Sequence, residues 1–361
     1  MSRIVHISTL GGPHAVSPSD FMSFVESAWR DPVACRKLRF LSKEAGISGK
    51  HSILPDFQAS CSSPLLYRDA SIPPGTEQRM AVFRNHAPAF AERVAKKALE
   101  ACAWQGEDLD AIVTVSCTGI TAPGLEIELS SRLGLRPDAE RHAVNFMGCY
   151  AAFHGLRLAH LICQSRPHAK VLVVCVELCS LHFRDDSSDD NLLSTALFSD
   201  GAAAVLLAGE ETSTPSLAQL EGFSSTLIHE GRKSMAWDVG NTGFEMVLHR
   251  SIPNVVETQM AEAFQRFLVD HDCTPSDISA YAIHPGGSKI LEAFARALAL
   301  DKRHLASSYE VLEEWGNMSS CTVLFVLERV LRQAAAGERV YTAAFGPGFT
   351  VESALLQIPS S

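Results

Sequence analysis

The stretch Asn145-Phe-Met-Gly-Cys149-Tyr-Ala-Ala (residues 145–152) leads from a tight turn into a long apolar segment. Gly148 permits a close backbone approach, and Cys149 follows it at the start of a helix that we predict over Ala151–Gln164. A thiol at a helix N-terminus faces the positive end of the helix dipole and free N–H groups, which both favour the thiolate. Since a cysteine in this place is more often structural, its role depends on the rest of the sequence.

Short apolar runs alternate with helical stretches on both sides of this segment. The pattern predicts buried strands over Ala111–Ser116, Lys170–Val176 and Ala202–Ala208. A helix is predicted over Ala87–Trp104, where apolar residues recur on one side and charged residues on the other. Such alternation is typical of an α/β fold built in layers.

The second half of the chain repeats this order. It carries a predicted helix (Asn254–Asp270), a strand (Ser279–His284), a turn (Gly316–Ser320), an apolar stretch (Cys321–Leu331) and a strand (Arg339–Ala344). Residues 116 and 149 lie 33 positions apart, and so do residues 284 and 317. We therefore predict two pseudo-symmetric halves, residues 1–210 and 211–361, divided at the polar stretch Glu210–Ser216.

Composition narrows the class of protein. The 361 residues are 46% hydrophobic and 20% charged, which is enough apolar material for a large core. The net charge of −10 argues against nucleic acid as a partner, because phosphate binding needs a basic face. We see no secretory signal and no apolar run of about 18 residues, so we expect a cytoplasmic protein without a membrane segment.

The ten cysteines and an acidic run could indicate disulfides or a metal, but neither pattern fits. No CxxC pair occurs, several cysteines lie inside apolar runs, and we expect reduced thiols. The run Arg184-Asp-Asp-Ser-Ser-Asp-Asp-Asn191 lacks the glycine and distal glutamate of a calcium loop, so we interpret it as a solvated loop. We expect no metal and no bound cofactor.

Two further segments could carry chemistry. His284 closes a predicted strand and is followed by Pro285-Gly-Gly287, at the strand end where α/β folds place ligand-facing groups. Asn317 precedes the apolar stretch of the second half, much as Cys149 precedes that of the first. Capping of the helix by Asn317 or Ser319 is the plainer interpretation of that segment.

Together with Ala196-Leu-Phe-Ser-Asp-Gly-Ala-Ala203 and Phe345-Gly-Pro-Gly-Phe349, these segments resemble the chalcone synthase family, the type III polyketide synthases. The resemblance covers nearly the whole chain with every motif in order. Met147-Gly-Cys-Tyr-Ala-Ala152, Cys117-Thr-Gly119 and Ala122-Pro-Gly124 are more similar to the bacterial members than to the plant members. The resemblance implies a thiolase fold, layered αβαβα with two pseudo-symmetric halves.

The resemblance also implies roles for the three residues. Cys149 would accept an acyl group from a CoA thioester, and His284 would pair with it as imidazolium. His284 and Asn317 would then donate hydrogen bonds to the malonyl-CoA thioester oxygen, which becomes an enolate oxygen when CO2 leaves. The carbanion would attack the acyl group on Cys149 and lengthen the chain by two carbons.

Further site residues follow from the same resemblance. Phe198 matches the family's gate between the CoA tunnel and the cavity, and a second gate falls at Phe244 or Met246. The remaining substrate-binding candidates are Cys117, Thr118, His182, Ser194, Gly286, Ser319, Phe345, Gly346 and Pro347. Candidates for binding CoA phosphates are Arg36, Lys37, Arg39, Lys43 and Lys289.

The sequence departs from the family at two places. The loop near the C-terminus opens with Ala344 where the family usually has glycine. Ala122 stands where plant members carry a methionine that reaches across the dimer, so that contact is lost or replaced. We still expect a homodimer that takes acyl-CoA and malonyl-CoA as substrates.

Three alternatives remain open at this point. An initiating ketoacyl-carrier-protein synthase shares the fold and a Cys-His-Asn set, but its histidine segment usually reads His-Gln-Ala-Asn rather than His284-Pro-Gly-Gly287. A non-catalytic member of the fold is the second. For the product, small side chains at Cys117, Ala122 and Ser194 favour a deep cavity, a fatty acyl starter and an alkylpyrone or alkylresorcinol; a naphthalene-type product from malonyl-CoA alone is the rival.

Overall fold

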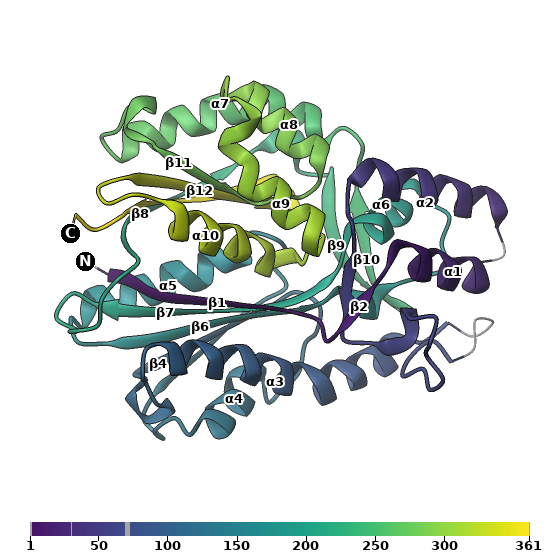
Figure 1. Cartoon of the computed structure of the whole chain (residues 1–361), viewed down its shortest axis with the longest axis horizontal. Coiled ribbons are helices and arrows are strands. Elements are labelled where there is room, and N and C mark those ends of the chain that lie inside the picture. The colour runs from purple at the N-terminus through teal and green to yellow at the C-terminus, as the bar shows by residue number, and fades with distance from the viewer. Residues whose placement is uncertain (1, 30, 69–72, 361) are drawn as a thin grey trace.

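A mixed β-sheet forms the frame of the molecule (Figure 1). The computed structural model describes residues 2–29, 31–68 and 73–360. In this part of the chain nine strands pair in the order β11-β12-β13-β8-β1-β7-β6-β4-β5. Their bounds are β1 (Ser2–Gly11), β4 (Ala111–Ser116), β5 (Glu140–Asn145), β6 (Lys170–Leu178), β7 (Asp200–Gly209), β8 (Ala218–Leu227), β11 (Ala280–Ile283), β12 (Arg339–Gly346) and β13 (Thr350–Gln357).

The strand directions repeat in the two halves of the sheet. In one half β4 is parallel to β6, β6 is antiparallel to β7, and β7 is antiparallel to β1. In the other half β11 is parallel to β12, β12 is antiparallel to β13, and β13 is antiparallel to β8. The halves join where Ser2–Ile4 of β1 pairs with Ala218–Leu220 of β8. The internal symmetry predicted from the spacing is therefore present in the strand order.

Helices cover the sheet in three layers (Figure 1). Their bounds are α1 (Pro18–Ala28), α2 (Pro32–Ala45), α3 (Thr76–Ala101), α4 (Leu125–Leu133), α5 (Ala151–Ser165), α6 (Asp189–Leu197), α7 (Ile252–Asp270), α8 (Ser288–Ala297), α9 (Ala306–Trp315) and α10 (Thr322–Gln333). Helices α5 and α10 lie between the two halves of the sheet, α3 and α4 cover one outer face, and α7 and α8 cover the other. This is the predicted αβαβα order.

Strand β6 shows why the layers form. Val171, Val173 and Cys175 face the cluster built by α5 and α10, while Leu172 and Val174 face the cluster built by α3. Because side chains alternate along a strand, a strand with helices on both faces must be apolar at every position. Full burial of one such aliphatic side chain stabilises the fold by roughly 1.5–3 kcal/mol.

Most predicted elements coincide with observed ones, and two differ. Helix α3 begins at Thr76, well before the predicted start, and contains Pro88. The acidic run is a loop only up to Ser188, because the Ser188 hydroxyl accepts from the Asn191 backbone N–H and starts α6 at Asp189. The prediction of a solvated loop through residue 191 was thus wrong for its last three residues. All ten cysteines are free, as expected.

Two small hairpins stand outside the large sheet. One pairs β2 (His14–Val16) with β3 (Lys50–Ser52), and the other pairs β9 (Met235–Gly240) with β10 (Gly243–Leu248). The connection between β7 and β8 contains the polar stretch where we placed the boundary between the halves. That boundary stays a prediction, and its outer ends, residues 1 and 361, lie outside the described residues. None of the helices in the described ranges is long and apolar enough to cross a membrane.

Candidate active site

Three chain segments bring Cys149, His284 and Asn317 to one cavity. Cys149 lies two residues before α5, His284 directly follows β11, and Asn317 precedes the short 3-10 helix Ser319–Cys321 that leads into α10. All three are buried, with exposed fractions of 8%, 1% and 2%. The pseudo-symmetric arrangement thus places one residue of the first half and two of the second around the same space.

Cys149 lies at the N-terminal end of α5, with its thiol toward the second half. Its Sγ lies 3.8 Å from the Ser319 hydroxyl oxygen. Burial raises the pKa of Cys149 to about 12, the hydrogen bond with Ser319 opposes this rise, and the nearby Glu177 adds to it. In this arrangement the desolvation of the thiol therefore has a larger effect on its pKa than the helix dipole, which we expected to favour the thiolate.

The His284 imidazole has both ring nitrogens buried and without a hydrogen-bond partner among the described residues. Burial lowers its pKa to about 3, so the ring is neutral. No hydrogen bond joins it to Cys149, and the thiolate–imidazolium pair stays a prediction. An unpaired buried polar group costs about 1–3 kcal/mol, which singles out this ring as one that can receive a bound group.

The Asn317 side chain forms hydrogen bonds through both its oxygen and its nitrogen. Its Oδ1 accepts from the Ser319 backbone N–H at 2.9 Å and from the Thr322 hydroxyl at 3.3 Å. Its Nδ2 points to the turn after His284 and lies 3.5 Å from the Gly286 carbonyl oxygen. The predicted side-chain cap is not formed, because the N-cap residues Met318 and Cys321 make no side-chain cap hydrogen bond. The two hydrogen bonds to Oδ1 instead fix the amide ahead of the 3-10 helix so that its nitrogen faces the histidine segment.

Phe198 is held beside Asn317 by backbone pairing. The Ser199 N–H donates to the Asn317 carbonyl oxygen, and the Asn317 N–H donates to the Leu197 carbonyl oxygen, both at 2.9 Å. Phe198 is half-buried and lines the cavity. The residue predicted as a gate thus adjoins a predicted catalytic residue of the other half.

Nearly all of the predicted substrate-binding residues line this cavity. They are Cys117, Thr118, His182, Ser194, Phe198, Phe244, Met246, Gly286, Ser319, Phe345 and Pro347. Gly346 lies directly behind the wall, where a Cβ would be 2.8 Å from the Tyr150 ring and 3.2 Å from the Cys149 nitrogen. The neighbouring Pro347 packs on Gly148, whose φ of +86° suits glycine. The loop 345–348 of the second half therefore closes directly over Cys149.

The hairpin β9–β10 supplies another wall and is fixed by side chains rather than by the large sheet. His182 Nε2 donates to the Thr118 carbonyl oxygen at 2.8 Å, and its Nδ1 accepts from the Phe244 N–H at 3.0 Å. The His182 and Phe244 rings stack with their centroids 4.2 Å apart. Burial lowers the pKa of His182 to about 3, so the ring stays neutral with the proton on Nε2. Phe244 and Met246 lie two positions apart on β10, so both candidates for the second gate belong to one wall.

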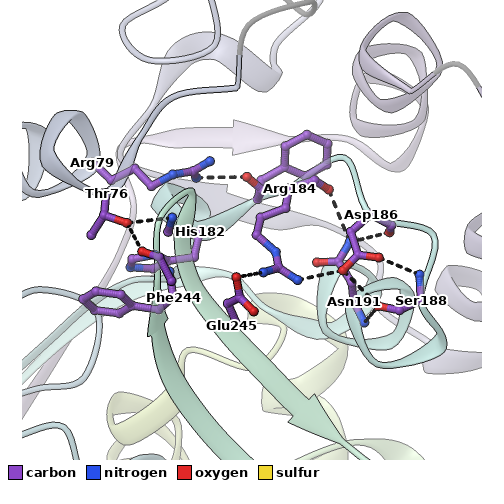
Figure 2. A network of polar contacts seen from close by, with 12 residues as sticks. Thr76, Arg79, His182, Arg184, Asp186, Ser188, Asn191, Phe244 and Glu245 are labelled. Atoms are coloured by element: carbon purple, nitrogen blue, oxygen red, sulfur yellow. Dashed lines mark hydrogen bonds and ion pairs between the residues drawn. The ribbon is translucent and has the colours of Figure 1, made fainter.

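Figure 2 shows how the same hairpin is tied to the neighbouring loop. The Thr76 hydroxyl accepts from the Gly243 N–H at 2.9 Å. Arg184 forms ion pairs of 2.7 Å with Glu245 of β10 and with Asp186. On the cavity side the Trp237 indole donates to the Cys117 carbonyl oxygen at 2.7 Å. These contacts hold the cavity wall against the first half.

The five basic residues predicted for CoA are not gathered in one place. Arg36 and Lys37 line one groove along α2, whereas Arg39 and Lys43 line a second groove on another side of the same helix. Lys37 is paired with Asp189 and Arg39 with Glu26. Lys289 is exposed near the start of α8. The second groove shares Val16, Phe21 and Lys50 with the cavity, so Arg39 and Lys43 flank its approach.

Glu177 of β6 is buried beside the cavity and was not among the residues predicted from the sequence. Its carboxylate accepts from the Cys117 N–H at 3.0 Å, from the Thr118 hydroxyl at 2.9 Å and from the Ser320 hydroxyl. Burial raises its pKa to about 7, and these hydrogen bonds oppose the rise. An acidic residue inside the apolar run Lys170–Leu178 was the available signal. Lys50 and Trp237 also line the cavity and were missed.

A buried cysteine at a helix start, a histidine with free ring nitrogens and an oriented asparagine, set in five layers, define a thiolase-fold acyl-transferring enzyme. Sequence models of the family described as chalcone and stilbene synthases match residues 37–211 with the N-terminal domain and 219–359 with the C-terminal domain. The chain belongs to this family and is a type III polyketide synthase, an acyltransferase.

Relatives and solved structures agree with this assignment. The alpha-pyrone synthesis polyketide synthase-like Pks18 of Mycobacterium tuberculosis is 35% identical over 79% of this chain and 74% of its own. A 1,3,6,8-tetrahydroxynaphthalene synthase of Streptomyces peucetius is 33% identical over 99% of this chain and 93% of its own. The crystal structure of PKS-I from the brown alga Ectocarpus siliculosus superposes with a TM-score of 0.93 at 27% identity, over 99% of this chain and 98% of its own.

A structure of CsyB complexed with CoA-SH also has the same fold. It superposes with a TM-score of 0.91 at 21% identity and covers 99% of this chain and all of its own. CoA binding is thus seen in a protein of this fold.

Proposed function

We propose that this synthase primes Cys149 with a fatty acyl group from acyl-CoA and extends it with malonyl-CoA to an alkylpyrone or alkylresorcinol. The observation that carries the choice of starter is the apolar lining of the cavity. One side is formed by Val16, Phe21, Phe57 and Phe183, and another by Met235, Trp237, Phe244, Met246 and Leu248. An alkyl chain gains about 0.8 kcal/mol for each CH2 group that it buries against such walls.

Priming requires a thiolate in a place where burial disfavours charge. His284 can take the thiol proton of Cys149 when the two side chains come within hydrogen-bond distance, and each new charge then stabilises the other. The thiolate attacks the starter thioester carbon, the carbon–sulfur bond to CoA breaks, and CoA leaves as the thiol after it takes up a proton. A cysteinyl thioester remains.

Extension uses the two polar groups of the second half. The His284 ring and the Asn317 amide nitrogen would donate hydrogen bonds to the malonyl thioester oxygen. Loss of CO2 leaves its bonding electrons as an enolate, which these donors stabilise while it forms. The enolate carbon attacks the cysteinyl thioester and expels the Cys149 thiolate, so the product is a ketoacyl-CoA two carbons longer.

Only two of the three small side chains expected to deepen the cavity line it. Cys117 and Ser194 line the cavity, but Ala122 is exposed in the turn before α4 and is not among the lining residues. The small side chain of Ala122 therefore adds no room for a substrate within this chain. Support for an alkyl starter comes from the apolar walls instead.

The test is a substrate panel. Purified protein is incubated with malonyl-CoA and acyl-CoA starters of two to about eighteen carbons, beside Cys149→Ala, and products are identified by mass. Pyrones or resorcinols that depend on medium- or long-chain starters and vanish in the variant would support the proposal. If those starters gave nothing while malonyl-CoA alone gave a product, the naphthalene-type alternative would replace it. Extension only from malonyl-carrier protein would favour the ketoacyl-carrier-protein synthase alternative.

Assembly and location remain predictions. We expect a homodimer, and sedimentation as a 39.1 kDa monomer at micromolar concentration would contradict it. We expect the protein in the cytoplasm, where both CoA thioesters would be available. Arg39 and Lys43 are the basic residues best placed for CoA phosphates, because they line the groove that adjoins the cavity.

A further inference from the structure

Lys50 is a basic residue of the cavity wall to which the mechanism assigns no role. It begins strand β3, and together with Val16 and Phe21 it lines both the cavity and the adjoining groove on α2. Among the described residues no carboxylate lies within ion-pair distance of its nitrogen. Burial lowers the pKa of Lys50 to about 7, and the nearby Cys179 and Asp200 oppose this shift. A buried lysine without an ion-pair partner must be stabilised by other groups nearby.

The partners of Lys50 are backbone carbonyl groups. Its Nζ donates to the Thr195 carbonyl oxygen at 2.6 Å and to the Phe198 carbonyl oxygen at 2.9 Å, and it lies 4.5 Å from the centre of the Phe21 ring. Both carbonyl groups belong to the C-terminal end of α6, which has no basic residue in its own last turn. Lys50 therefore supplies, from another element, the positive group that a helix C-terminus favours.

The same short segment is held from its other side by Asn317. The Asn317 backbone forms hydrogen bonds with Leu197 and Ser199, on either side of Phe198, and the Lys50 Nζ donates to the carbonyl oxygen of Phe198 itself. The Ser199 hydroxyl also accepts from the His51 N–H at 2.8 Å, which joins the segment to β3. A shift of the Phe198 backbone would therefore move the gate and disturb the place of Asn317.

We propose that Lys50 is a positioning residue of the acyl-transfer reaction, which holds the Phe198 gate and the adjoining Asn317 in place by binding the C-terminal carbonyl groups of α6. The role rests on the proposed function of Phe198 and Asn317. Lys50 touches neither reacting carbon atoms nor Cys149 in this account. It acts through the backbone of the gate.

The substitution Lys50→Met keeps an unbranched side chain of nearly the same length and removes every donor. We expect kcat/KM for condensation to fall about 10- to 100-fold, because misplacing a catalytic group by about 1 Å costs up to about 100-fold. Lys50→Arg restores hydrogen-bond donors at the end of the side chain and should recover most of the lost kcat/KM. The matched control is Lys97→Met, since Lys97 also donates to a backbone carbonyl oxygen, that of Thr9, but lies exposed on α3.

A double-mutant cycle separates positioning from simple stabilisation. If Lys50 positions the gate, Lys50→Met should change starter preference in the wild-type background and have little further effect on that preference beside Phe198→Ala. A loss of thermal stability alone, with wild-type kcat/KM and starter preference for the folded enzyme, would overturn the proposal. So would full additivity of the two effects on starter preference, or a failure of Lys50→Arg to recover activity lost in Lys50→Met.

One readout does not depend on polyketide chemistry. The rates at which iodoacetamide and a bulky maleimide alkylate Cys149 give the size selectivity of the passage. We expect Lys50→Met to change the ratio of these rates at least about fivefold, while Lys97→Met leaves it unchanged. If the wild type makes no polyketide but the ratio changes, the proposed function fails and the positioning role stands. If the wild type is active and the ratio, kcat/KM and starter preference are all unchanged, the positioning role fails alone.

Discussion

The two halves of the molecule share a strand order but differ in the residues that they place at equivalent ends. Cys117 follows β4, and its sulfur accepts a hydrogen bond from the Gly148 N–H at 2.9 Å. His284 follows β11, and its ring nitrogens have no hydrogen-bond partner among the described residues. Ahead of the central helices stand Cys149 in the first half and Asn317 in the second. One scaffold thus carries the proposed nucleophile on one side and the proposed hydrogen-bond donors on the other.

The seam between the halves completes the site. Pro347 packs on Gly148, Asn317 pairs with the segment around Phe198, and Glu177 accepts from Ser320. Each contact joins a residue of one half to a residue of the other. The two halves can therefore contribute different residues to one site only while these contacts hold the halves in a fixed relative position.

Removal of the nucleophile should give the largest effect. We expect Cys149→Ala to lower condensation by about 10⁴-fold or more, because no cysteinyl thioester can form. Cys163→Ala is the control, since Cys163 is buried near the other end of the same helix, α5. The measurement is product formation from acyl-CoA and malonyl-CoA under saturating conditions. Equal activity of Cys149→Ala and the control would remove Cys149 from the mechanism.

The second prediction separates the two roles of Asn317. Asn317→Asp keeps an oxygen to accept from Ser319 and Thr322 but removes the amide nitrogen that faces the His284 turn. We expect condensation to fall about 10²- to 10³-fold, as for loss of one donor to a developing oxyanion. Asn317→Ala, which loses the hydrogen bonds of both the oxygen and the nitrogen, should lower condensation at least as much. Retained activity in Asn317→Asp would reduce the residue to a structural role.

Much of the fold was predictable because its signals are local. The runs that became β4, β6 and β7 are apolar at nearly every position, as double-sided burial requires, and equal spacings gave the internal symmetry. The start of α3 was missed because its first four residues, Thr76–Arg79, are polar and the next four, Met80–Phe83, form a continuous apolar run instead of recurring at helical spacing. The acidic run was misjudged because Ser188 caps α6 and the two acidic residues of its first turn, Asp189 and Asp190, favour a helix N-terminus rather than a loop.

The site was predictable only where its residues lie in motifs. The segments around Cys149, His284 and Asn317 were found as strand or helix ends, and family resemblance gave their roles. The basic residues were a weaker prediction because residues close in sequence, such as Lys37 and Arg39, lie on different sides of α2. The charge states of Cys149 and His284 depend on burial by elements distant in sequence, which no local pattern reports.

The third prediction concerns the seam at Glu177. Its pKa is raised from the ordinary 4.5 to about 7, so the folded state keeps a proton that the unfolded state loses. This stabilising contribution is full below pH 4.5 and is lost as the pH rises to 7, by roughly 3 kcal/mol in all. We expect Glu177→Gln, which mimics the protonated acid, to unfold with a flatter dependence on pH.

Urea unfolding at several pH values between 4.5 and 8 measures this difference. Glu128→Gln, at an exposed position on α4, is the control and should keep the wild-type slope. A Glu177→Gln slope equal to that of the wild type would mean that the carboxylate is already ionised throughout this range.

The smallest effect is expected from a pair of glycines that differ only in what surrounds them. Gly148 and Gly134 have φ angles of +86° and +72°, so alanine at either position meets backbone strain of about 1–2 kcal/mol. A Cβ on Gly134 would meet nothing within 4 Å, whereas a Cβ on Gly148 would lie 2.2 Å from the Pro347 Cδ. We expect Gly148→Ala to lose a further 1–3 kcal/mol or so through this overpacking. It should also lower kcat/KM, because the displaced loop lies against Cys149, whereas Gly134→Ala should leave kcat/KM unchanged. Equal losses of stability in the two variants, with unchanged activity in both, would show that the halves can shift past each other here without effect on the site.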